Sequence, residues 1–372
     1  MLRNYMGIIN LEEKENDIRS LTANRPIGTI PIGGRFRVID FILSDMINAG
    51  LTHISVFAAK STRSLSDHLG SGKPWDLDRK TDGLFTFSNS ILGSVDNATA
   101  QTFGMNMEFF SRAKQENVIL ASSYMIANMD LDYLAEQHEA SGADISVVYK
   151  PITNGESDFL NCDLIKFDKN NRVMNISKNI GIEENVNVCM EIFFMKKKLL
   201  TELLYKAAAD GAKGAFKEFI YNNILSYHVN ALPFTGYARC INSVESFYNT
   251  NMDMLELEVT GELFSPVNPI YTKTKDSPPA HYVQGSDVSH AIVADGSIIR
   301  GTVKNSVIFR NVHIEEGAVL DGCIVLPNVT VGKNAVLSNV IVDKGVVIDD
   351  GVTVQCPKQY PLVFEKKSYT KV

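Results

Sequence analysis

The 372-residue sequence predicts an α/β protein in two parts, a doubly wound domain followed by a left-handed parallel β-helix. Over the first two-thirds, short apolar runs alternate with helical patterns. A proline-rich segment interrupts this alternation, and after it aliphatic residues recur at intervals of six. We therefore expect an α/β domain over residues 1–258, a connector over 259–282, and a β-helix domain with a C-terminal tail over 283–372.

The predicted strands of the first domain are short runs rich in β-branched residues, at 4–9, 53–59, 117–122 and 144–150. Helical patterns at 36–50, 129–142 and 196–211 lie between or after them, and the last stops at a glycine. The apolar runs could also be buried helix segments, but their β-branched content favours strands. This alternation is typical of a doubly wound sheet, whose ligand crevice lies at the carboxyl ends of the strands.

Four prolines mark the segment that ends this pattern, Pro266, Pro269, Pro278 and Pro279. Proline fits neither a helix interior nor a central strand. The segment is therefore predicted to be an extended connector between the two domains.

The last hundred residues carry a six-residue repeat of aliphatic side chains. Between them lie small or polar residues and glycines, and the repeating positions are Ile314, Leu320, Leu326, Val331, Leu337, Ile348 and Val354. Such a period is typical of a parallel β-helix in which each hexad forms one flat side and three complete a coil. A β-sandwich is the alternative, but its strands rarely keep this spacing over so many repeats. The sides of such coils are expected to serve as subunit contacts.

Composition narrows the function classes. The net charge of −7 and pI near 5.6 argue against a general nucleic-acid or membrane-surface role. No apolar run approaches the length of a membrane span, and the N-terminus lacks a signal-peptide pattern. The five cysteines are scattered without zinc-site spacing. We expect a cytoplasmic protein.

Several segments together resemble one enzyme family. They are LTANRPIGTIPIGGRFRVIDFILSDMINAG at 21–50, SLSDHLGSGKPWDLDR at 64–79, GYARCINSVESFYNTNMDML at 236–255 and the repeats at 306–332. In this order, over almost the whole chain, they are similar to ADP-glucose pyrophosphorylase, the glucose-1-phosphate adenylyltransferase family. The resemblance implies a nucleotidyltransferase-like first domain. It also implies an in-line attack of glucose 1-phosphate on the α-phosphorus of ATP, with magnesium in the active relatives.

The positions that hold the nucleotide in this family are altered. The family's glycine-rich loop, GGxGxRLxxLT, falls on residues 11–17, where no glycine occurs and the arginine position lies on or near Asp17. Acidic side chains there would repel a triphosphate. The family's lysine near the phosphates corresponds to Ile27.

The two metal-binding aspartates of the family correspond to Ser123 and Cys240. Asp130 and Asp132 lie nearby but are expected to cap the next helix. We therefore expect no metal site and no cofactor in this chain.

On the sugar-phosphate side, the family's EKP corresponds to Ser177-Lys178-Asn179, so only the lysine persists. Lys178 is either a remnant of the sugar-phosphate site or a surface lysine at a strand edge. The family's SMG and DFG are changed too, to Cys189-Met190-Glu191 and Gly214-Ala215-Phe216.

Arg25, Arg35 and Arg37 lie where the resemblance implies a pocket for effector anions. Alternatively, they form structural ion pairs with carboxylates such as Asp40 or Asp45. The retained loop around Trp75 suggests a role in packing or subunit contact.

Loss of all these positions together indicates a non-catalytic branch of the family. The expected function is that of a regulatory pseudoenzyme in glycogen biosynthesis, which binds the catalytic glucose-1-phosphate adenylyltransferase subunit in a homo- or hetero-tetramer. No nucleic-acid or membrane partner is expected. The alternatives are a working or weakly active nucleotidyltransferase and a stand-alone sugar-phosphate sensor.

Overall fold

The computed structural model describes residues 1–58, 63–88, 99–210 and 215–366. By their internal contacts they form two compact units. Unit 1 comprises residues 1–14, 39–240 and 264–271, and unit 2 comprises residues 15–38, 241–263 and 272–372. Both units are discontinuous in sequence, whereas the sequence suggested three consecutive segments. The assignment of domains to residues 1–258, 259–282 and 283–372 stays a prediction.

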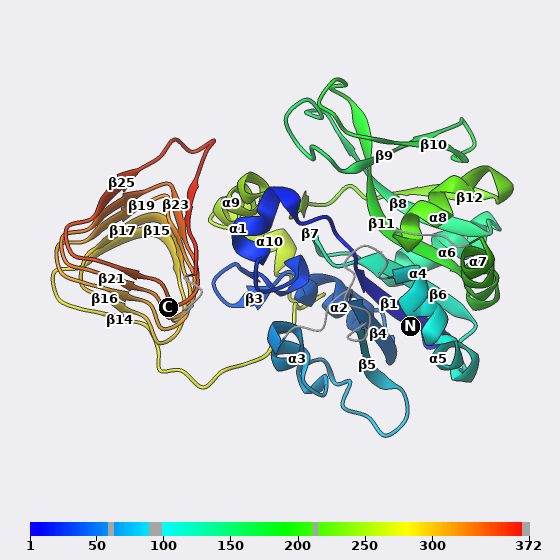
Figure 1. Ribbon diagram of the computed structural model, residues 1–372, viewed down its shortest axis with the longest axis horizontal. Helices are drawn as coiled ribbons and strands as arrows, with labels where there is room; N and C mark the ends of the chain where they lie inside the picture. Colours follow the sequence, from blue (N-terminus) through cyan, green and yellow to red (C-terminus); the bar gives the residue numbers. More distant parts are fainter. Residues whose placement is uncertain (59–62, 89–98, 211–214, 367–372) are drawn as a thin grey trace. The chain divides into compact units, whose positions relative to one another are not determined.

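Unit 1 is built on a nine-stranded mixed sheet (Figure 1). β1 lies parallel to both β4 and β6, and β5 extends the parallel part beyond β4. On the other side β11 runs antiparallel to β6, β8 and β9. The strands are β1 (Tyr5–Leu11), β4 (His53–Ala58), β5 (Gly83–Ser88), β6 (Asn117–Ser122), β8 (Ile145–Ile152), β9 (Asp163–Phe167), β10 (Val173–Lys178), β11 (Val186–Lys196) and β12 (Val229–Pro233).

Helices cover both faces of this sheet, as the doubly wound prediction requires. They are α2 (Ile39–Asn48), α3 (Arg63–Leu69), α4 (Thr99–Met105), α5 (Met107–Arg112), α6 (Leu131–Ser141), α7 (Lys197–Ala209) and α8 (Phe216–Asn222). Side chains alternate along β1, so Met6 and Ile8 join the core cluster that includes residues of α4, α5 and α7. Gly7 faces the opposite way, and a Cβ there would lie 2.6 Å from the sulfur of Met46 in α2. Glycine therefore lets α2 pack closely against β1.

The predicted strands at 4–9, 117–122 and 144–150 and the helices at 129–142 and 196–211 are confirmed within one or two residues at most ends. The strand predicted at 53–59 is confirmed as β4 up to Ala58. Its last predicted residue, Ala59, and the last residue of the helix predicted at 196–211, Gly211, lie outside the described residues. The helix predicted over 36–50 begins later, at Ile39. Its expected first residues instead form β3 (Phe36–Arg37), which pairs with β2 (Pro31–Ile32) across a turn. Two glycines with positive φ, Gly33 and Gly34, make that turn.

Unit 2 contains short helices and the predicted left-handed parallel β-helix. The helical segments are η1 (Asn16–Ile18), α1 (Arg19–Thr22), η2 (Ile27–Thr29), α9 (Val244–Asp253) and α10 (Leu257–Leu263). The strands of the coils are β14 (His281–Tyr282), β15 (Asp287–Val293), β16 (Ile298–Ile299), β17 (Thr302–Ile308), β18 (His313–Ile314), β19 (Val319–Asp321), β20 (Ile324–Val325), β21 (Thr330–Val331), β22 (Val336–Ser338), β23 (Val340–Val342), β24 (Val347–Ile348), β25 (Thr353–Gln355) and β26 (Leu362–Phe364).

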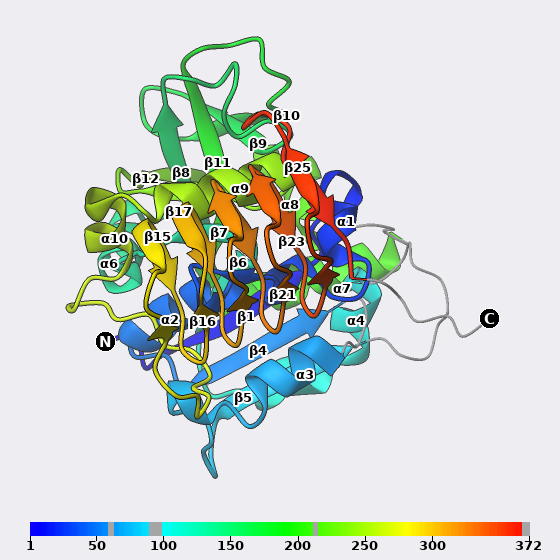
Figure 2. The same ribbon diagram turned by 90° about the vertical axis from the view of Figure 1, so that its left-hand side faces the viewer.

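Most of the coils stack with a repeat of 17 residues, as in the register from Leu320 to Leu337 to Val354. Figure 2 shows β17, β23 and β25 following one another along the stack. This repeat is one residue shorter than three hexads because it includes the step of five visible between Leu326 and Val331. An earlier coil is shorter, since β15 pairs with β17 at an offset of 15 residues. The inward aliphatic side chains form one continuous core.

Asparagines at several corners of the coils adopt positive φ, as at Asn311 (56°), Asn328 (62°) and Asn334 (55°). Asparagine tolerates this left-handed conformation better than most residues. The side chain of Asn311 donates to Asn328 Oδ1 of the next coil at 3.2 Å. These corners therefore fix both the turn and the register.

The proline-rich segment has neither helix nor strand over residues 265–280. It is shorter than the connector expected over 259–282, because α10 continues to Leu263 and β14 takes His281–Tyr282. Its first part belongs to unit 1, where Asn48 and Asn128 donate to the carbonyls of Pro269 and Asn268 at 3.1 and 2.8 Å. The chain passes into unit 2 at Thr272.

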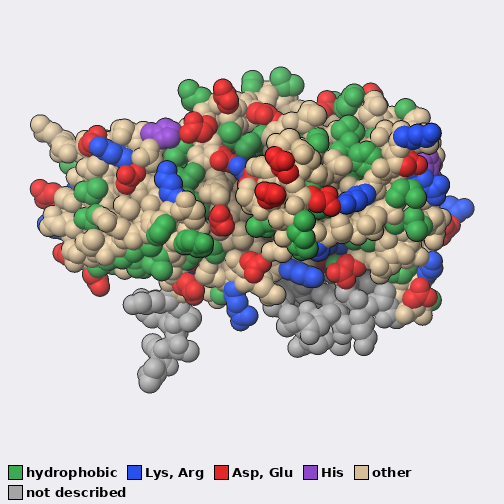
Figure 3. Space-filling view, turned by 90° about the horizontal axis from the view of Figure 1, so that it is seen from above, with side chains coloured by type: hydrophobic (Ala, Val, Ile, Leu, Met, Phe, Trp, Pro, Cys, Tyr) green, Lys and Arg blue, Asp and Glu red, His purple; other side chains and the backbone are tan. Residues whose placement is uncertain are grey.

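Acidic and basic side chains are interspersed on the face drawn in Figure 3. No helix within the described ranges has the length and apolar character needed to cross a membrane.

Candidate functional site

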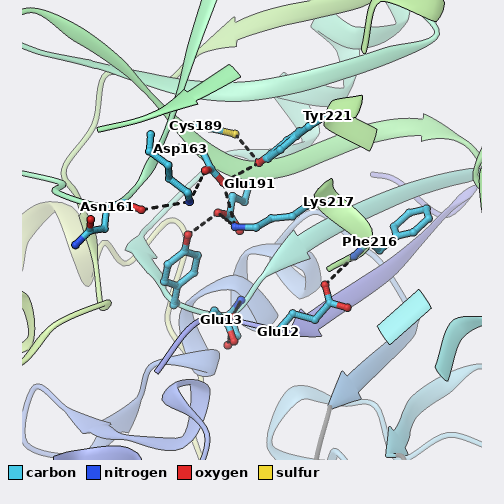
Figure 4. A network of polar contacts seen from close by, with 12 residues as sticks. Glu12, Glu13, Asn161, Asp163, Cys189, Glu191, Phe216, Lys217 and Tyr221 are labelled. Carbon is cyan, nitrogen blue, oxygen red and sulfur yellow. Dashed lines mark hydrogen bonds and ion pairs between the residues drawn. The ribbon is translucent and has the colours of Figure 1, made fainter. Parts of the chain in front are cut away.

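The candidate site lies in unit 1, where the parallel strands β1 and β6 both end (Figure 4). Ligands of doubly wound sheets bind at this edge. Glu12 and Glu13 follow β1, and Ser123 follows β6. The acidic stretch noted in the sequence thus reaches the expected crevice through its first two carboxyl groups.

Glu13 binds Ser123. Its Oε1 accepts hydrogen bonds from the Ser123 backbone N–H at 2.7 Å and from the Ser123 hydroxyl at 2.6 Å. Burial raises the pKa of Glu13 to about 7, although these hydrogen bonds act to lower it. The residue at the family's first metal-aspartate position is therefore fully engaged by a carboxyl group of the same chain.

Glu12 binds the start of α8. Its Oε2 accepts a hydrogen bond from the Phe216 backbone N–H at 3.0 Å. Burial raises the pKa of Glu12 to about 8, against the Asn10 side chain and the Phe216 N–H, which act to lower it. A second backbone donor at the crevice is thus occupied by an acidic side chain.

A buried ion-pair network fills the sugar-phosphate side. The Lys217 ammonium contacts the carboxylates of both Glu191 and Asp163, the latter at 3.0 Å. The Tyr124 hydroxyl donates to Glu191 at 2.5 Å, and the Tyr221 hydroxyl donates to Asp163 at 3.2 Å. Figure 4 shows these groups converging from different strands and helices of unit 1.

The network shifts the pKa values of its members in opposite directions. Burial acts to lower the pKa of Lys217, but the Glu191 and Asp163 carboxylates raise it overall. Burial raises the pKa of Glu191, whereas Lys217 and Lys178 together hold the pKa of Asp163 below its usual value despite burial. Lys217 therefore stays charged and bound to its two partners.

Lys178, a candidate sugar-phosphate remnant, is about half exposed at the end of β10. Its ammonium pairs with Asp163 and donates to the Asn161 carbonyl at 3.3 Å. It therefore belongs to the edge of the same network, and a role in binding a sugar phosphate stays a prediction.

The other altered family positions are placed as follows. Asp17 lies in η1 and belongs to unit 2, so the carboxyl groups at the crevice are Glu12 and Glu13 instead. Ile27 is fully buried in unit 2. Cys240 ends β13 (Ala238–Cys240), which pairs with β7 (Met125–Ala127), and burial together with the neighbouring Cys162 thiol raises its pKa.

These residues do not suit magnesium, which prefers oxygen ligands in octahedral geometry. Ser123 is taken by Glu13, and Cys240 offers a buried, protonated thiol. Within the described residues, no three His, Cys, Asp or Glu side chains are arranged to hold a metal ion. Asp130, in contrast, caps α6 as predicted and accepts from the Tyr133 N–H at 3.0 Å.

The three candidate effector arginines lie in unit 2. Arg25 pairs with Asp343 at 2.6 Å, Arg37 donates to the Thr29 carbonyl at 3.3 Å, and Arg35 lies over the Phe36 ring at 4.9 Å. The suggested partners Asp40 and Asp45 belong to unit 1, where Asp40 bonds His68 and burial raises the pKa of Asp45 well above normal. A structural pair thus exists at Arg25, but with a different carboxylate.

Several cations act on Lys344 of the β-helix. Burial lowers the pKa of Lys344, and Lys275, Arg37, Lys366 and Arg25 lower it further by charge repulsion. Of these, Arg25 is paired with the Asp343 carboxylate. An excess of positive charge attracts anions. The sequence pointed to the arginines but not to the lysines.

Sequence reasoning also missed Asp163 and Tyr221, which anchor the network around Lys217. Each is a single polar residue in a strand or helix far along the chain, and neither carries a motif. Only the three-dimensional structure brings them to Glu191.

Comparison with known proteins agrees with this architecture. Residues 17–178 match the nucleotidyl transferase family model, and residues 278–359 match the GlmU-like C-terminal hexapeptide model. The chain is 31% identical to the glycogen biosynthesis protein GlgD of Bacillus subtilis (strain 168), over 98% of this chain and 97% of that protein.

Two further relatives extend the comparison. GlgD of Geobacillus stearothermophilus is 32% identical over 86% of this chain and 84% of its own length. Glucose-1-phosphate adenylyltransferase of Fervidobacterium nodosum is 28% identical over 99% of this chain and 89% of its own length. The chain belongs to the family of the glycogen biosynthesis protein GlgD.

Proposed function

We propose that this chain is a non-catalytic, regulatory subunit of glucose-1-phosphate adenylyltransferase in bacterial glycogen biosynthesis. In this proposal it binds a catalytic subunit in a cytoplasmic heterotetramer and changes that subunit's response to substrates or effectors. Its relatives named GlgD and glucose-1-phosphate adenylyltransferase support the pathway. The geometry of the candidate site supports the lack of catalysis.

The observation that carries the proposal is the occupation of the crevice by the chain's own acids. Phosphoryl transfer relies on donors and cations aimed at phosphate oxygens. Here the donors of Ser123 and Phe216 are bound by Glu13 and Glu12. A triphosphate would have to displace two buried carboxyl groups and would be repelled by them when ionised.

The sugar-phosphate side supports the same conclusion. Lys217 lines the crevice together with Glu12 and Glu13, and it is already bound to Glu191 and Asp163. Withdrawing it would break two buried ion pairs and leave Asp163 with Lys178 alone, at a cost of about 3–5 kcal/mol. A substrate phosphate would therefore compete against a strong internal ion pair.

The regulatory part of the proposal draws on the cations around Lys344. Phosphorylated metabolites are suitable ligands for such a group because guanidinium and ammonium ions bind phosphate oxygens. The same cluster is the observation that favours the second candidate function, a stand-alone sugar-phosphate sensor. The two candidates differ in whether a catalytic partner is bound.

The test is to express the chain alone and together with a catalytic glucose-1-phosphate adenylyltransferase. We expect the chain alone to release no pyrophosphate from Mg-ATP and glucose 1-phosphate. We also expect the two chains to co-elute, and the partner's apparent affinities for substrates or effectors to change roughly 5–150-fold. Separate elution with unchanged kinetics would refute the regulatory role. Chelator-sensitive turnover by the purified chain alone would instead establish an active nucleotidyltransferase.

A further inference from the structure

A small cavity with both polar and apolar lining lies at the carboxyl ends of β1 and β6. Its volume is about 30 Å3, and its polar lining consists of Asn10, Glu12, Glu13, Ser122, Glu191 and Lys217. A space of this size holds roughly two water molecules, or one small ion with little hydration. It is too small for a nucleotide or a sugar.

Three oxygens on this lining are buried without a hydrogen-bond partner. They are Asn10 Oδ1, Glu12 Oε1 and Ser122 Oγ. The Asn10 residue is only 8% exposed, so its amide oxygen has no access to bulk water. Buried polar atoms normally have partners, and an unpaired acceptor costs about 1–3 kcal/mol. An amide oxygen and an ionised carboxylate oxygen can only accept, so once Glu12 is deprotonated the missing partner is a donor or a cation.

The charge balance points to a cation. Lys217, the ammonium that lines the cavity, contacts Asp163 and Glu191, and Lys178 also pairs with Asp163. Above their raised pKa values of about 8 and about 7, Glu12 and Glu13 add two carboxylates that no ammonium contacts among the ion pairs of the described residues. Above about pH 8 these groups therefore carry excess negative charge.

The ligand set distinguishes between classes of cation. A divalent or transition-metal site would need several charged ligands, and the described residues form no such group of three. An amide oxygen, a hydroxyl and one carboxylate are instead the hard oxygen ligands that replace the hydration shell of potassium-like ions. We propose that the cavity binds a monovalent cation, an alkali ion or ammonium, between Asn10, Glu12 and Ser122.

Such an ion would connect the end of β1 to the end of β6. Asn10 and Glu12 lie just before the chain leaves unit 1 at Lys14, and Ser122 is the last residue of β6. Binding would therefore stabilise this segment against local opening. The inference concerns this cavity alone and does not depend on the proposed regulatory function.

The first test measures thermal unfolding of the full chain at about pH 9, where Glu12 and Glu13 are ionised, and at constant ionic strength, replacing choline chloride stepwise with potassium, sodium or ammonium chloride. Choline is too large for the cavity and serves as the inert cation. A saturable rise of about 2–4 °C in Tm with at least one small cation is expected. An identical Tm in all four salts would overturn the proposal.

Variants assign the effect to the cavity. Asn10→Leu keeps the side-chain size but removes the amide oxygen, and Ser122→Ala removes the hydroxyl; each should abolish most of the cation-dependent rise. Glu136→Gln, at an exposed position on α6, is the matched control and should keep it. A full cation response in both cavity variants would contradict the assignment.

A second measurement does not depend on variants that fold. Crystals of the wild-type chain soaked in rubidium chloride should show an anomalous scattering peak between Asn10 Oδ1 and Glu12 Oε1. Density in the cavity without an anomalous signal would mean water only and would refute the cation. Turnover by the chain alone, or a failure to bind a catalytic partner, would refute the proposed function but would change neither the Tm response nor the anomalous peak. The two proposals therefore fail separately.

Discussion

Glu13 Oε1 accepts hydrogen bonds from both the backbone N–H and the hydroxyl of Ser123, at 2.7 and 2.6 Å. The serine is fully buried, so no water competes for these donors. One carboxyl oxygen thereby joins the residue after β1 to the residue after β6. An internal acid occupies donors that, at the edge of such a sheet, could hold an anionic ligand.

Replacing Glu12 and Glu13 with glutamine should change how stability depends on pH. The folded-state pKa values, about 8 and about 7, lie above the ordinary value of 4.5. Between pH 4.5 and 8 the folded chain therefore binds more protons than the unfolded chain, and stability falls as pH rises. The double variant should lose most of this fall in a series of thermal or urea unfolding midpoints.

Glu136→Gln controls for the loss of surface charge and should follow the wild-type pH profile. A wild-type stability that stays flat or rises between pH 5 and 8, with no difference from the double variant, would show that the two carboxyls are not buried as described.

Lys217→Met should destabilise unit 1 strongly. The substitution leaves Asp163 and Glu191, both only 4% exposed at their side chains, without the ammonium that they share. Breaking a buried ion pair in this way costs about 3–5 kcal/mol. Lys178→Met, at a side chain 47% exposed, should cost only about 0–1 kcal/mol.

Urea unfolding of both lysine variants measures the difference. Equal midpoints would mean that the Lys217 network contributes little to the fold. A substrate phosphate would then meet no strong internal competitor for Lys217.

Periodicity explains why the fold could be predicted. Alternating apolar runs determine β1 and β6, and the spacing of Leu320 and Leu337 determines the coils, because each pattern is repeated locally many times. The candidate site could be predicted from the sequence only in part. The acidic residues after β1, Glu12 and Glu13, can be recognised in the sequence because they stand where the family has glycines. The role of Asp163 depends on contacts between distant segments and leaves no sequence pattern.

The hypothesis for Asp40 illustrates the same limit. The sequence suggested arginine as the partner of Asp40, because the arginines are close in sequence. The structure instead brings His68 of α3 to it, with Nε2 2.5 Å from Asp40 Oδ1. Charge alone could not indicate a histidine 28 residues away.

Phosphate-bearing anions should raise the Tm of the chain through the cations around Lys344. The Lys344→Gln variant should show a smaller rise with inorganic phosphate or a hexose phosphate, because the half-buried ammonium gains most from a neutralising anion. Lys333→Gln, an exposed position on the same β-helix, is the control and should respond like the wild type. Identical anion responses in both variants would place the binding elsewhere or exclude it.

His68→Ala should alter the environment of Trp75, the single tryptophan of the chain. Trp75 is only 1% exposed, and the His68 ring meets it edge to face with centroids 5.5 Å apart. Removing the imidazole opens a space beside the indole and removes the hydrogen bond between His68 and the fully buried Asp40. We expect a red shift of tryptophan emission and a loss of about 2–4 kcal/mol in stability. His281→Ala, at an exposed position, should change neither, and an unchanged emission maximum in His68→Ala would show that the loop around Trp75 does not depend on the Asp40–His68 contact.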